Sequence, residues 1–273
     1  KMVETGHIAQ EEMEQAAQTK IRLAHPQSNS NNKAPFFVDF VKAELIRKLS
    51  DRFSESELPS AGLRVYTTLL PLINQAAQRA VSEGVSAQEK RLDVKKFPVQ
   101  NLRLEGALAA VDHRNGYIRA LVGGRNYSES TFNRILNMKR QVGSTFKPLL
   151  FLAALQKGKD SHGVPFSPAY PLEDAPYNLT YDRSQPTWSP KNYEPGFEGW
   201  VPMRKALAHS INTAAARLTQ EVSIKEVINT ARALGIESEL AEVPSIALGT
   251  SELSPVELLK AYAAIANHGQ TDE

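Results

Sequence analysis

The chain has 273 residues, a formal net charge of +2 and no cysteine. This length can bury a substantial core, and it suits one large domain or two smaller ones. A nearly neutral charge without a clustered basic face argues against nucleic acid as a partner. Without cysteine the chain has neither a disulfide nor a thiol nucleophile. The apolar runs are shorter than the ~20 residues that cross a bilayer. Because Lys1 looks like the middle of a longer protein, we expect further segments before it.

The N-terminal part predicts two helices separated by a polar linker. Residues 2–23 favour a helix after a glycine break at Gly6, because the following segment is rich in Glu, Gln and Ala. Residues 25–33 form a polar low-complexity run that is typical of an exposed linker. Residues 35–49 place apolar side chains at helical spacing and predict the second helix.

A strand and another helix are predicted next. Residues 63–69 alternate in character as a strand does. Pro71 begins a helix that we expect to end near Gly84. Residues 89–102 are charged and irregular, which is typical of a seam between domains.

From Leu104 onward the pattern predicts a β-hairpin and then a long loop. Two apolar runs, 104–111 and 117–122, flank a turn whose Asn115-Gly116 pair favours positive φ. The proline- and aromatic-rich stretch 163–202 is typical of a long ordered surface loop.

Helical patterns occupy the rest of the chain. Residues 203–222 have apolar side chains at near-helical spacing, with an interruption at 209–212. Capping boxes at 223–226 and 254–257 begin two more helices, and Gly235 is typical of the end of the first. A hairpin accompanied by helices, without alternating βαβ units, predicts an α+β domain.

The stretch 140–148 has the clearest chemical character. It places the Ser144 hydroxyl and the Lys147 amine on one face at the start of a predicted helix. Gly143 lets the backbone turn into that helix, and Pro148 falls where amide donors lack an intrahelical partner. A serine nucleophile beside a lysine base suggests covalent acyl transfer. The apolar stripe expected to bury the helix consists of Phe151, Leu152 and Leu155.

This pattern alone is weak evidence. A Ser-x-x-Lys sequence occurs by chance in chains of this size, and Ser30 to Lys33 matches it inside the polar linker. A lone Ser144 is more often a helix N-cap than a nucleophile. The stretch 210–212 alone is more often a helix break. Whether Ser144 and Lys147 form a catalytic pair therefore has to be judged from the surrounding residues.

The order of motifs resembles one family. Ser144-Thr145-Phe146-Lys147 followed by Ser210-Ile211-Asn212 is similar to the first two penicilloyl-serine transferase motifs, Ser-x-x-Lys and Ser-x-Asn. The third motif, Lys-Thr-Gly, is not found, and we expect it beyond Glu273. Further stretches resemble class A penicillin-binding proteins in the same order: 65–69, 106–112, 120–124, 132–134, 188–193, 206–212 and 247–255.

The resemblance implies a fold and domain boundaries. Residues 104–273 resemble a penicillin-binding, serine β-lactamase-like transpeptidase domain of the α+β class, incomplete at its C-terminus, with helices flanking an antiparallel sheet. Residues 25–103 resemble the small mixed linker region before that domain. Residues 1–24 resemble the last helix of the family's glycosyltransferase domain. The glycosyltransferase site and a single membrane anchor are expected outside this chain.

The resemblance also implies roles for five residues. Ser144 is expected to attack the carbonyl between the terminal D-alanines of a peptidoglycan stem peptide, and Lys147 to take the serine proton. The amine has to be neutral for this, so its pKa has to fall by about 3 units from its usual ~10.4. Ser210 is expected to relay a proton to the leaving amine. Asn212 and Gly143 are expected to bind the substrate.

The implied partners are peptidoglycan stem peptides, lipid II-derived glycan, β-lactams and cell-wall regulators. The resemblance implies no cofactor and no metal, and the histidines lack the spacing of a zinc site. It implies a D,D-transpeptidase or carboxypeptidase at the extracytoplasmic face of the bacterial cytoplasmic membrane (periplasm).

Other interpretations stay open. A serine β-lactamase shares both motifs but lacks the upstream linker, and a non-catalytic scaffold with a degenerate transpeptidase domain would only bind cell-wall partners. A Ser-His-Asp triad of Asp112, His113 and Ser144 is disfavoured because the first two lie in a predicted hairpin turn. The aromatic residues of the long loop are expected either to line the substrate cleft or to pack within the loop: Trp188, Tyr193, Phe197 and Trp200.

Overall fold

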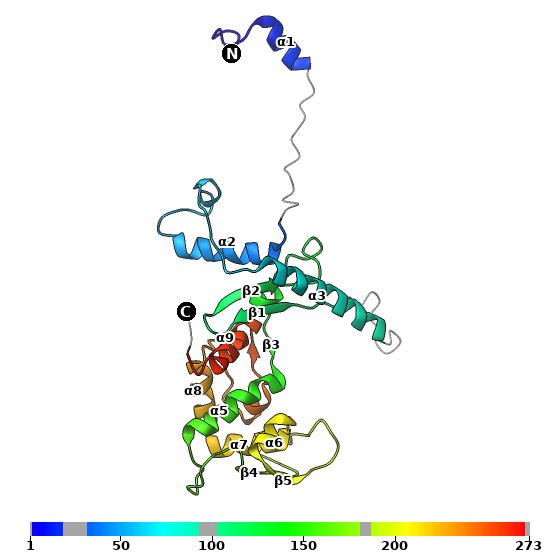
Figure 1. Cartoon of the computed structure of the whole chain (residues 1–273), viewed down its shortest axis with the longest axis vertical. Helices are drawn as coiled ribbons and strands as arrows, with labels where there is room; N and C mark the ends of the chain where they lie inside the picture. The colour runs from blue at the N-terminus through cyan, green and yellow to red at the C-terminus, as the bar shows by residue number, and fades with distance from the viewer. Residues whose placement is uncertain (1, 19–31, 93–102, 181–186, 271–273) are drawn as a thin grey trace. The chain divides into compact units, whose positions relative to one another are not determined.

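A computed structural model describes residues 2–18, 32–92, 103–180 and 187–270. The chain divides into two compact units, Lys1–Lys33 and Ala34–Glu273 (Figure 1). In the first unit Gly6 takes a φ of 72°, and helix α1 follows at Gln10–Gln18. The predicted glycine break and helix are therefore confirmed, while residues 19–23 of that prediction lie outside the described residues. Within the described ranges no helix is long and apolar enough to cross a membrane.

The second unit begins with α2 (Pro35–Leu49), whose bounds match the prediction. The strand predicted at 63–69 is wrong, because this segment forms no ladder. It runs beside a later strand and meets it through three bonds: the Thr68 hydroxyl donates to Ile118 O (2.9 Å), Arg119 Nη1 donates to Thr68 O (3.2 Å), and Leu70 N donates to Arg119 O (3.0 Å). A ladder requires successive backbone pairs, and here side chains supply two of the three contacts.

Helix α3 (Pro71–Arg91) continues past Gly84, where its end was predicted. A glycine in a helix interior costs only about 1 kcal/mol relative to alanine. The apolar residues of α3 offset this cost because they are buried against the hairpin that follows. The small shared cluster consists of Ala77, Val81, Ala120 and Val122.

The hairpin is confirmed. β1 (Leu108–Asp112) and β2 (Tyr117–Val122) pair in antiparallel fashion, and Gly116 in the turn takes a φ of 65°. The buried Asn74 side chain of α3 accepts a hydrogen bond from Leu121 N (3.0 Å). This bond ties the linker helix to the strand. A second cluster joins α2 to the hairpin through Phe36, Phe37, Leu121 and Ile135.

The largest core lies among the later helices. α5 (Lys147–Lys157) packs against α7 (Asn212–Val222) and α8 (Ile224–Ala233) (Figure 1). The predicted apolar stripe of α5 is partly wrong, because Leu155 is 44% exposed and Leu152 only half-buried. Since α5 has neighbours on several sides, its buried face is broader than one stripe. That face consists of Leu149, Leu150, Phe151, Ala153 and Ala154.

Short antiparallel pairs complete the unit. β3 (Arg140–Gln141) pairs with β6 (Glu252–Leu253), and β4 (Pro171–Asp174) pairs with β5 (Gly199–Pro202). The stretch 163–202, predicted as an ordered surface loop, thus contains the β4/β5 pair, and its residues 181–186 lie outside the described residues. The remaining elements are η1 (Leu58–Ser60), α4 (Arg134–Asn137), η3 (Gly143–Phe146), α6 (Met203–Ala208), η4 (Pro244–Leu248) and α9 (Pro255–Ala266). Antiparallel pairs with flanking helices confirm the α+β class.

Both predicted helix starts are confirmed, although only the second of the two predicted capping boxes is complete. The Ser223 side chain accepts from Glu226 N (3.3 Å) at the start of α8. Ser254 and Glu257 form a complete capping box at the start of α9. Gly235 takes a φ of 87° just after α8, as a residue ending a helix does.

Candidate active site

Ser144 lies in the short 3₁₀ turn η3, which leads directly into α5. Gly143 takes a φ of 58°, which confirms the turn predicted for it, and its N–H donates to Gly249 O (3.0 Å). Phe146, at the end of the turn, is fully buried. The backbone beneath Ser144 is thus anchored on two sides, while the Ser144 side chain is exposed.

Lys147 is the first residue of α5 and is only 1% exposed. Its Nζ donates to Ser210 O (2.6 Å), Ser210 Oγ (2.9 Å) and Asn212 Oδ1 (2.6 Å). Among the described residues no carboxylate pairs with this amine. Burial lowers the pKa of Lys147 to about 8. Most of the decrease that the acyl-transfer chemistry needs is therefore present.

The break between α6 and α7 brings the second motif to this amine. Ser210 takes a φ of 54°, which a non-glycine residue rarely adopts. Ile211 N donates back to Ala206 O (2.9 Å), which closes the end of α6, and α7 begins at Asn212. The predicted interruption at 209–212 is confirmed for residues 209–211, while Asn212 already belongs to α7. Its left-handed turn presents both the carbonyl and the hydroxyl of Ser210 to Lys147.

The contacts of Lys147 suit both of its protonation states. An ammonium group has three N–H donors, and the observed acceptors satisfy all of them. A neutral amine keeps two donors and gains a lone pair. Because Ser210 O and Asn212 Oδ1 can only accept, the neutral amine donates to these two and accepts from the Ser210 hydroxyl. Ser210 can therefore pass a proton along this contact in either direction.

Ser144 stands next to this group without being bonded to it. Among the described residues its side chain makes no hydrogen bond. In a 3₁₀ turn the side chains at i and i+3 eclipse each other, which puts Ser144 on the face of Lys147. The structure thus brings Lys147, Ser210 and Asn212 together and leaves the Ser144 hydroxyl exposed beside them.

The comparisons with known proteins identify the family. The family model described as "Penicillin binding protein transpeptidase domain" matches residues 106–273. This chain belongs to that family. Over 246 residues it is 33% identical to penicillin-binding protein 2D of Bacillus subtilis, covering 89% of this chain and 32% of the relative. Over 240 residues it is 33% identical to penicillin-binding protein 1B of Vibrio cholerae, covering 88% and 29%. These relatives confirm the class A resemblance, and the chain spans about a third of their length.

Solved structures agree with the transpeptidase fold. Penicillin-binding protein 1A from Haemophilus influenzae superposes with a TM-score of 0.75 at 22% identity, covering 97% of this chain and 50% of that chain. PonA1 from Mycobacterium tuberculosis in complex with penicillin V gives a TM-score of 0.66 at 26% identity, covering 87% and 60%. The predicted fold, a penicillin-binding transpeptidase domain with antiparallel strands and flanking helices, is therefore confirmed.

Sequence reasoning missed two residues of this transpeptidase domain that hold the second motif. Asn192 lies in the stretch 188–193 that resembles class A penicillin-binding proteins, but no role was predicted for it. Asp174 belongs to no motif recognised in the sequence. Asn192 Oδ1 accepts from Asn212 N (3.0 Å), and Asn192 Nδ2 donates to Asp174 Oδ1 (2.7 Å). Polar residues in a loop look alike in sequence, so only the tertiary contacts distinguish these two.

The Ser-His-Asp alternative is excluded by geometry. The Asp112 carboxylate accepts from Arg114 Nε (2.9 Å) and Arg119 Nη2 (3.2 Å), so arginines rather than His113 hold it. Ser30 of the chance Ser-x-x-Lys match lies outside the described residues. In the long loop Trp188 is half-buried against Tyr177. The other three aromatic residues considered for the substrate cleft are largely exposed: Tyr193, Phe197 and Trp200.

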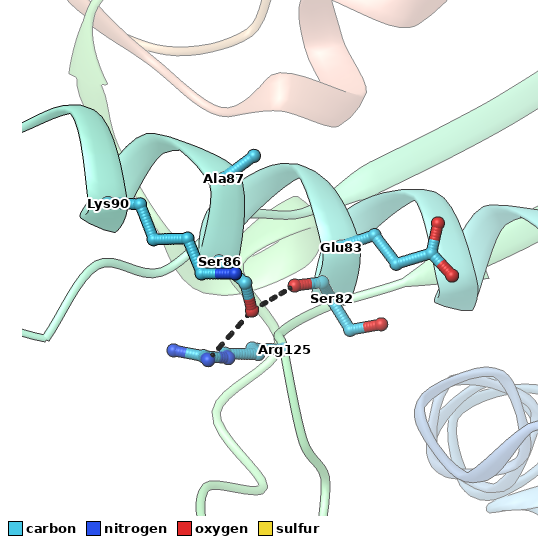
Figure 2. Close-up of a pocket in the computed structure, with 6 residues that line it drawn as sticks. All are labelled: Ser82, Glu83, Ser86, Ala87, Lys90 and Arg125. Carbon is cyan, nitrogen blue, oxygen red and sulfur yellow. Dashed lines mark hydrogen bonds between the residues drawn. The ribbon is translucent and has the colours of Figure 1, made fainter.

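A separate hollow of about 450 Å³ lies on the linker helix α3. Figure 2 shows Ser86 between Ser82 and Arg125: its hydroxyl donates to Ser82 O (2.8 Å) and accepts from Arg125 Nη2 (3.0 Å). Arg125 also donates to both carboxylate oxygens of Glu89 (2.9 Å each), which balances its charge. None of the residues lining this hollow belongs to the group around Lys147.

Proposed function

We propose that this chain is the linker and most of the transpeptidase domain of a bifunctional peptidoglycan synthase, and that Ser144 forms an acyl-enzyme with a stem peptide. The observation that carries the proposal is the buried Lys147 amine, held by uncharged partners one turn after an exposed serine. Such an amine can exist in its neutral form near neutral pH, as a general base must.

In the first step Ser144 Oγ bonds to the carbonyl carbon of the penultimate D-alanine. Its proton passes to Lys147 Nζ, whose lone pair turns from the Ser210 hydroxyl to Ser144 Oγ for this transfer. Catalytic hydrogen bonds often tighten only when substrate is bound, which accounts for the unpaired Ser144 hydroxyl. The ammonium formed is at once satisfied by its three acceptors. Ser210 then relays a proton from Nζ to the departing nitrogen, the C–N bond breaks, and D-alanine leaves.

In the second step an amine from a neighbouring stem attacks the Ser144 ester. The proton of that amine passes to Lys147, the ester C–O bond breaks, and Ser144 Oγ recovers a proton. The product is a peptide crosslink. The same intermediate attacked by water would give the carboxypeptidase reaction.

The backbone around Ser144 suits the developing oxyanion. Among the described residues, Ser144 N–H has no acceptor, so it can donate to the substrate oxygen. Asn212 Nδ2 donates to Lys191 O (2.7 Å) and keeps a second N–H for the substrate amide. A side chain at Gly143 would point into open space, and glycine leaves that side free for substrate.

We further propose that the full protein acts at the extracytoplasmic face of the bacterial cytoplasmic membrane, with a single membrane anchor and a glycosyltransferase site outside this chain. Its partners would be stem peptides, lipid II-derived glycan and cell-wall regulators. Class A relatives several times its length support this proposal. The structural relative in complex with penicillin V supports β-lactams as ligands.

The experiment is incubation of the full-length protein with a stem pentapeptide donor and an amine acceptor, followed by chromatography of the products. We expect release of D-alanine with formation of crosslinked peptide, both lost in Ser144→Ala. Rapid hydrolysis of penicillin without crosslinking would instead indicate a β-lactamase. Absence of both D-alanine release and penicillin acylation would indicate a non-catalytic scaffold.

A further inference from the structure

The Asn212 side chain and backbone are held from a different part of the chain. Its Oδ1 accepts from Lys147 Nζ (2.6 Å), and its Nδ2 donates to Lys191 O (2.7 Å). The N–H groups of Asn212 and Thr213 open α7, where no intrahelical acceptor exists. Both donate to Asn192 Oδ1, at 3.0 and 3.3 Å. The residue before α7 supplies no side-chain cap, so Asn192 caps the helix from the long loop.

A buried carboxylate fixes the orientation of Asn192. Asp174, at the end of β4, is 2% exposed and accepts from Asn192 Nδ2 (2.7 Å), Thr213 Oγ1 (2.5 Å) and Glu198 N (2.8 Å). Burial acts to raise the pKa of Asp174, but these hydrogen bonds hold it below its usual value. An ionised carboxylate only accepts, so the amide NH₂ of Asn192 faces Asp174 and its oxygen faces α7.

We propose that Asp174 and Asn192 are positioning residues for acylation, which hold Asn212 and through it the Lys147 amine. Neither hydrogen-bonds to Ser144 or Lys147 among the described residues, so both act through geometry. This inference rests on the proposed roles of Ser144 and Lys147.

A small displacement of Asn212 should cause a large loss of acylation rate. Without the Asn192 acceptor, the first two N–H groups of α7 lose their partner and the first turn loosens. Asn212 then moves relative to Lys147, whose contacts with Asn212 and Ser210 set the direction of its lone pair. Misplacement of a catalytic group by about 1 Å can cost about 10²-fold in rate.

The test is the second-order rate constant for acylation of the full-length protein by a fluorescent penicillin. Thr213→Val removes the hydroxyl that binds Asp174 with little change of shape, whereas Thr213→Ser keeps that hydroxyl. We expect Thr213→Val and Asn192→Ala to slow acylation by about 10-fold to about 100-fold, and Thr213→Ser to stay near the wild-type rate. Asn178→Ala is the matched control, because Asn178 lies in the same loop and bonds to Ser189 instead of α7.

A double variant tests whether Asn192 acts through Asn212. Acylation by Asn192→Ala with Asn212→Ala should be no slower than by Asn212→Ala alone, within about twofold, because coupled residues are not additive. Fully additive losses, or equal rates for Thr213→Val and Thr213→Ser, would overturn the inference. If Asn192→Ala fails to fold, the comparison of acylation rates between Thr213→Val and Thr213→Ser tests the inference instead. Labelling of Ser144→Ala at the wild-type level would instead refute the proposed function.

Discussion

At the scale of single residues, the proposed chemistry depends on how Lys147 is buried. A buried ammonium is costly unless it is paired or hydrogen-bonded. A carboxylate partner would remove that cost but raise the pKa again. The protein uses two uncharged residues, Ser210 and Asn212, in place of a carboxylate. Their oxygens satisfy the amine while burial keeps its pKa at about 8.

The first prediction concerns pH. Because Lys147, the proposed base, would work only when neutral, the acylation rate should rise with pH through about 8, its pKa, and level off above it. Lys147→Arg should lower the rate by about 10²-fold or more and abolish this dependence, since a guanidinium does not deprotonate. The measurement is the rate of labelling by fluorescent penicillin across the pH range. A flat wild-type profile would be incompatible with lysine as the base.

The residues of the site were only partly predictable. The two motifs gave Ser144, Lys147, Ser210 and Asn212 because the resemblance fixes their order along the chain. The contact between Lys147 and Ser210 depends on how α5 packs beside the start of α7, which no local pattern contains. The roles of Asp174 and Asn192 could not be predicted from the sequence for the same reason.

At the scale of elements, two closely packed turns support Ser144, the proposed nucleophile. η4 (Pro244–Leu248) ends at Gly249, which has a φ of 66°. A Cβ atom built at Gly249 would lie 2.1 Å from Gly143 O, closer than any real contact. Only glycine lets the two backbones approach this closely.

The second prediction follows from this contact. Gly249→Ala should displace the Ser144 turn and slow acylation by about 10-fold or more. Gly235→Ala is the matched control, because Gly235 also has positive φ but open space around it. The control should lose about 1 kcal/mol of stability from backbone strain and keep its acylation rate. Rates and thermal melting of both variants check this, and equal acylation rates would show that the contact is unimportant.

The third prediction concerns the start of α9. Glu257 accepts from Ser254 N (2.9 Å), Ser238 N (2.6 Å) and Glu237 N (2.9 Å). Burial acts to raise the pKa of Glu257, but hydrogen bonds from Ser254 and Ser238 lower it to about 2. Because the folded pKa lies below the unfolded value of 4.5, the stabilisation is complete above that value and is lost as the pH falls towards 2.

Glu257→Gln should therefore lower the free energy of unfolding by about 1–3 kcal/mol near neutral pH, because an amide NH₂ replaces an acceptor. The difference from wild type should shrink in acid. Glu252→Gln, at an exposed position of β6, is the control. The measurement is denaturant unfolding at neutral and acidic pH. If wild type and Glu257→Gln differed by the same free energy at both pH values, the ionised Glu257 carboxylate would not be the source of the stabilisation.

Elements were predictable where the local pattern is strong. α2 and the hairpin follow from periodicity and the Asn-Gly turn, and the caps of α8 and α9 from Ser223 and Ser254. The failures arose where tertiary packing overrides the pattern. Residues 63–69 alternate as a strand does, but their contacts with β2 are made mainly by side chains and form no ladder. Helix α3 continues through Gly84 because the hairpin supports it.

At the scale of the whole molecule, the linker and the transpeptidase part share their cores. α3 contributes Ala77 and Val81 to a cluster with β2, and α2 contributes Phe36 and Phe37 to another. The predicted boundaries 1–24, 25–103 and 104–273 stay a prediction. These clusters indicate that the linker residues from Ala34 onward fold together with the hairpin.

The fourth prediction tests this coupling. Asn74→Ala removes the acceptor of Leu121 N and leaves a buried donor unpaired, so the free energy of unfolding should fall by about 1–3 kcal/mol. The hairpin should still unfold in one transition with the rest of the unit. Gln75→Ala, at an exposed position of the same helix, should change little. Equal stability of the two variants would show that α3 and β2 are not coupled.

The central claim is that Ser144 carries the acyl group, and the most direct measurement is the position of the penicilloyl adduct. Full-length protein is treated with penicillin and digested, and the modified peptide is sequenced by mass spectrometry. The account predicts one adduct, on Ser144, which is absent from Ser144→Ala. An adduct on a different residue, or undiminished acylation of Ser144→Ala, would contradict it.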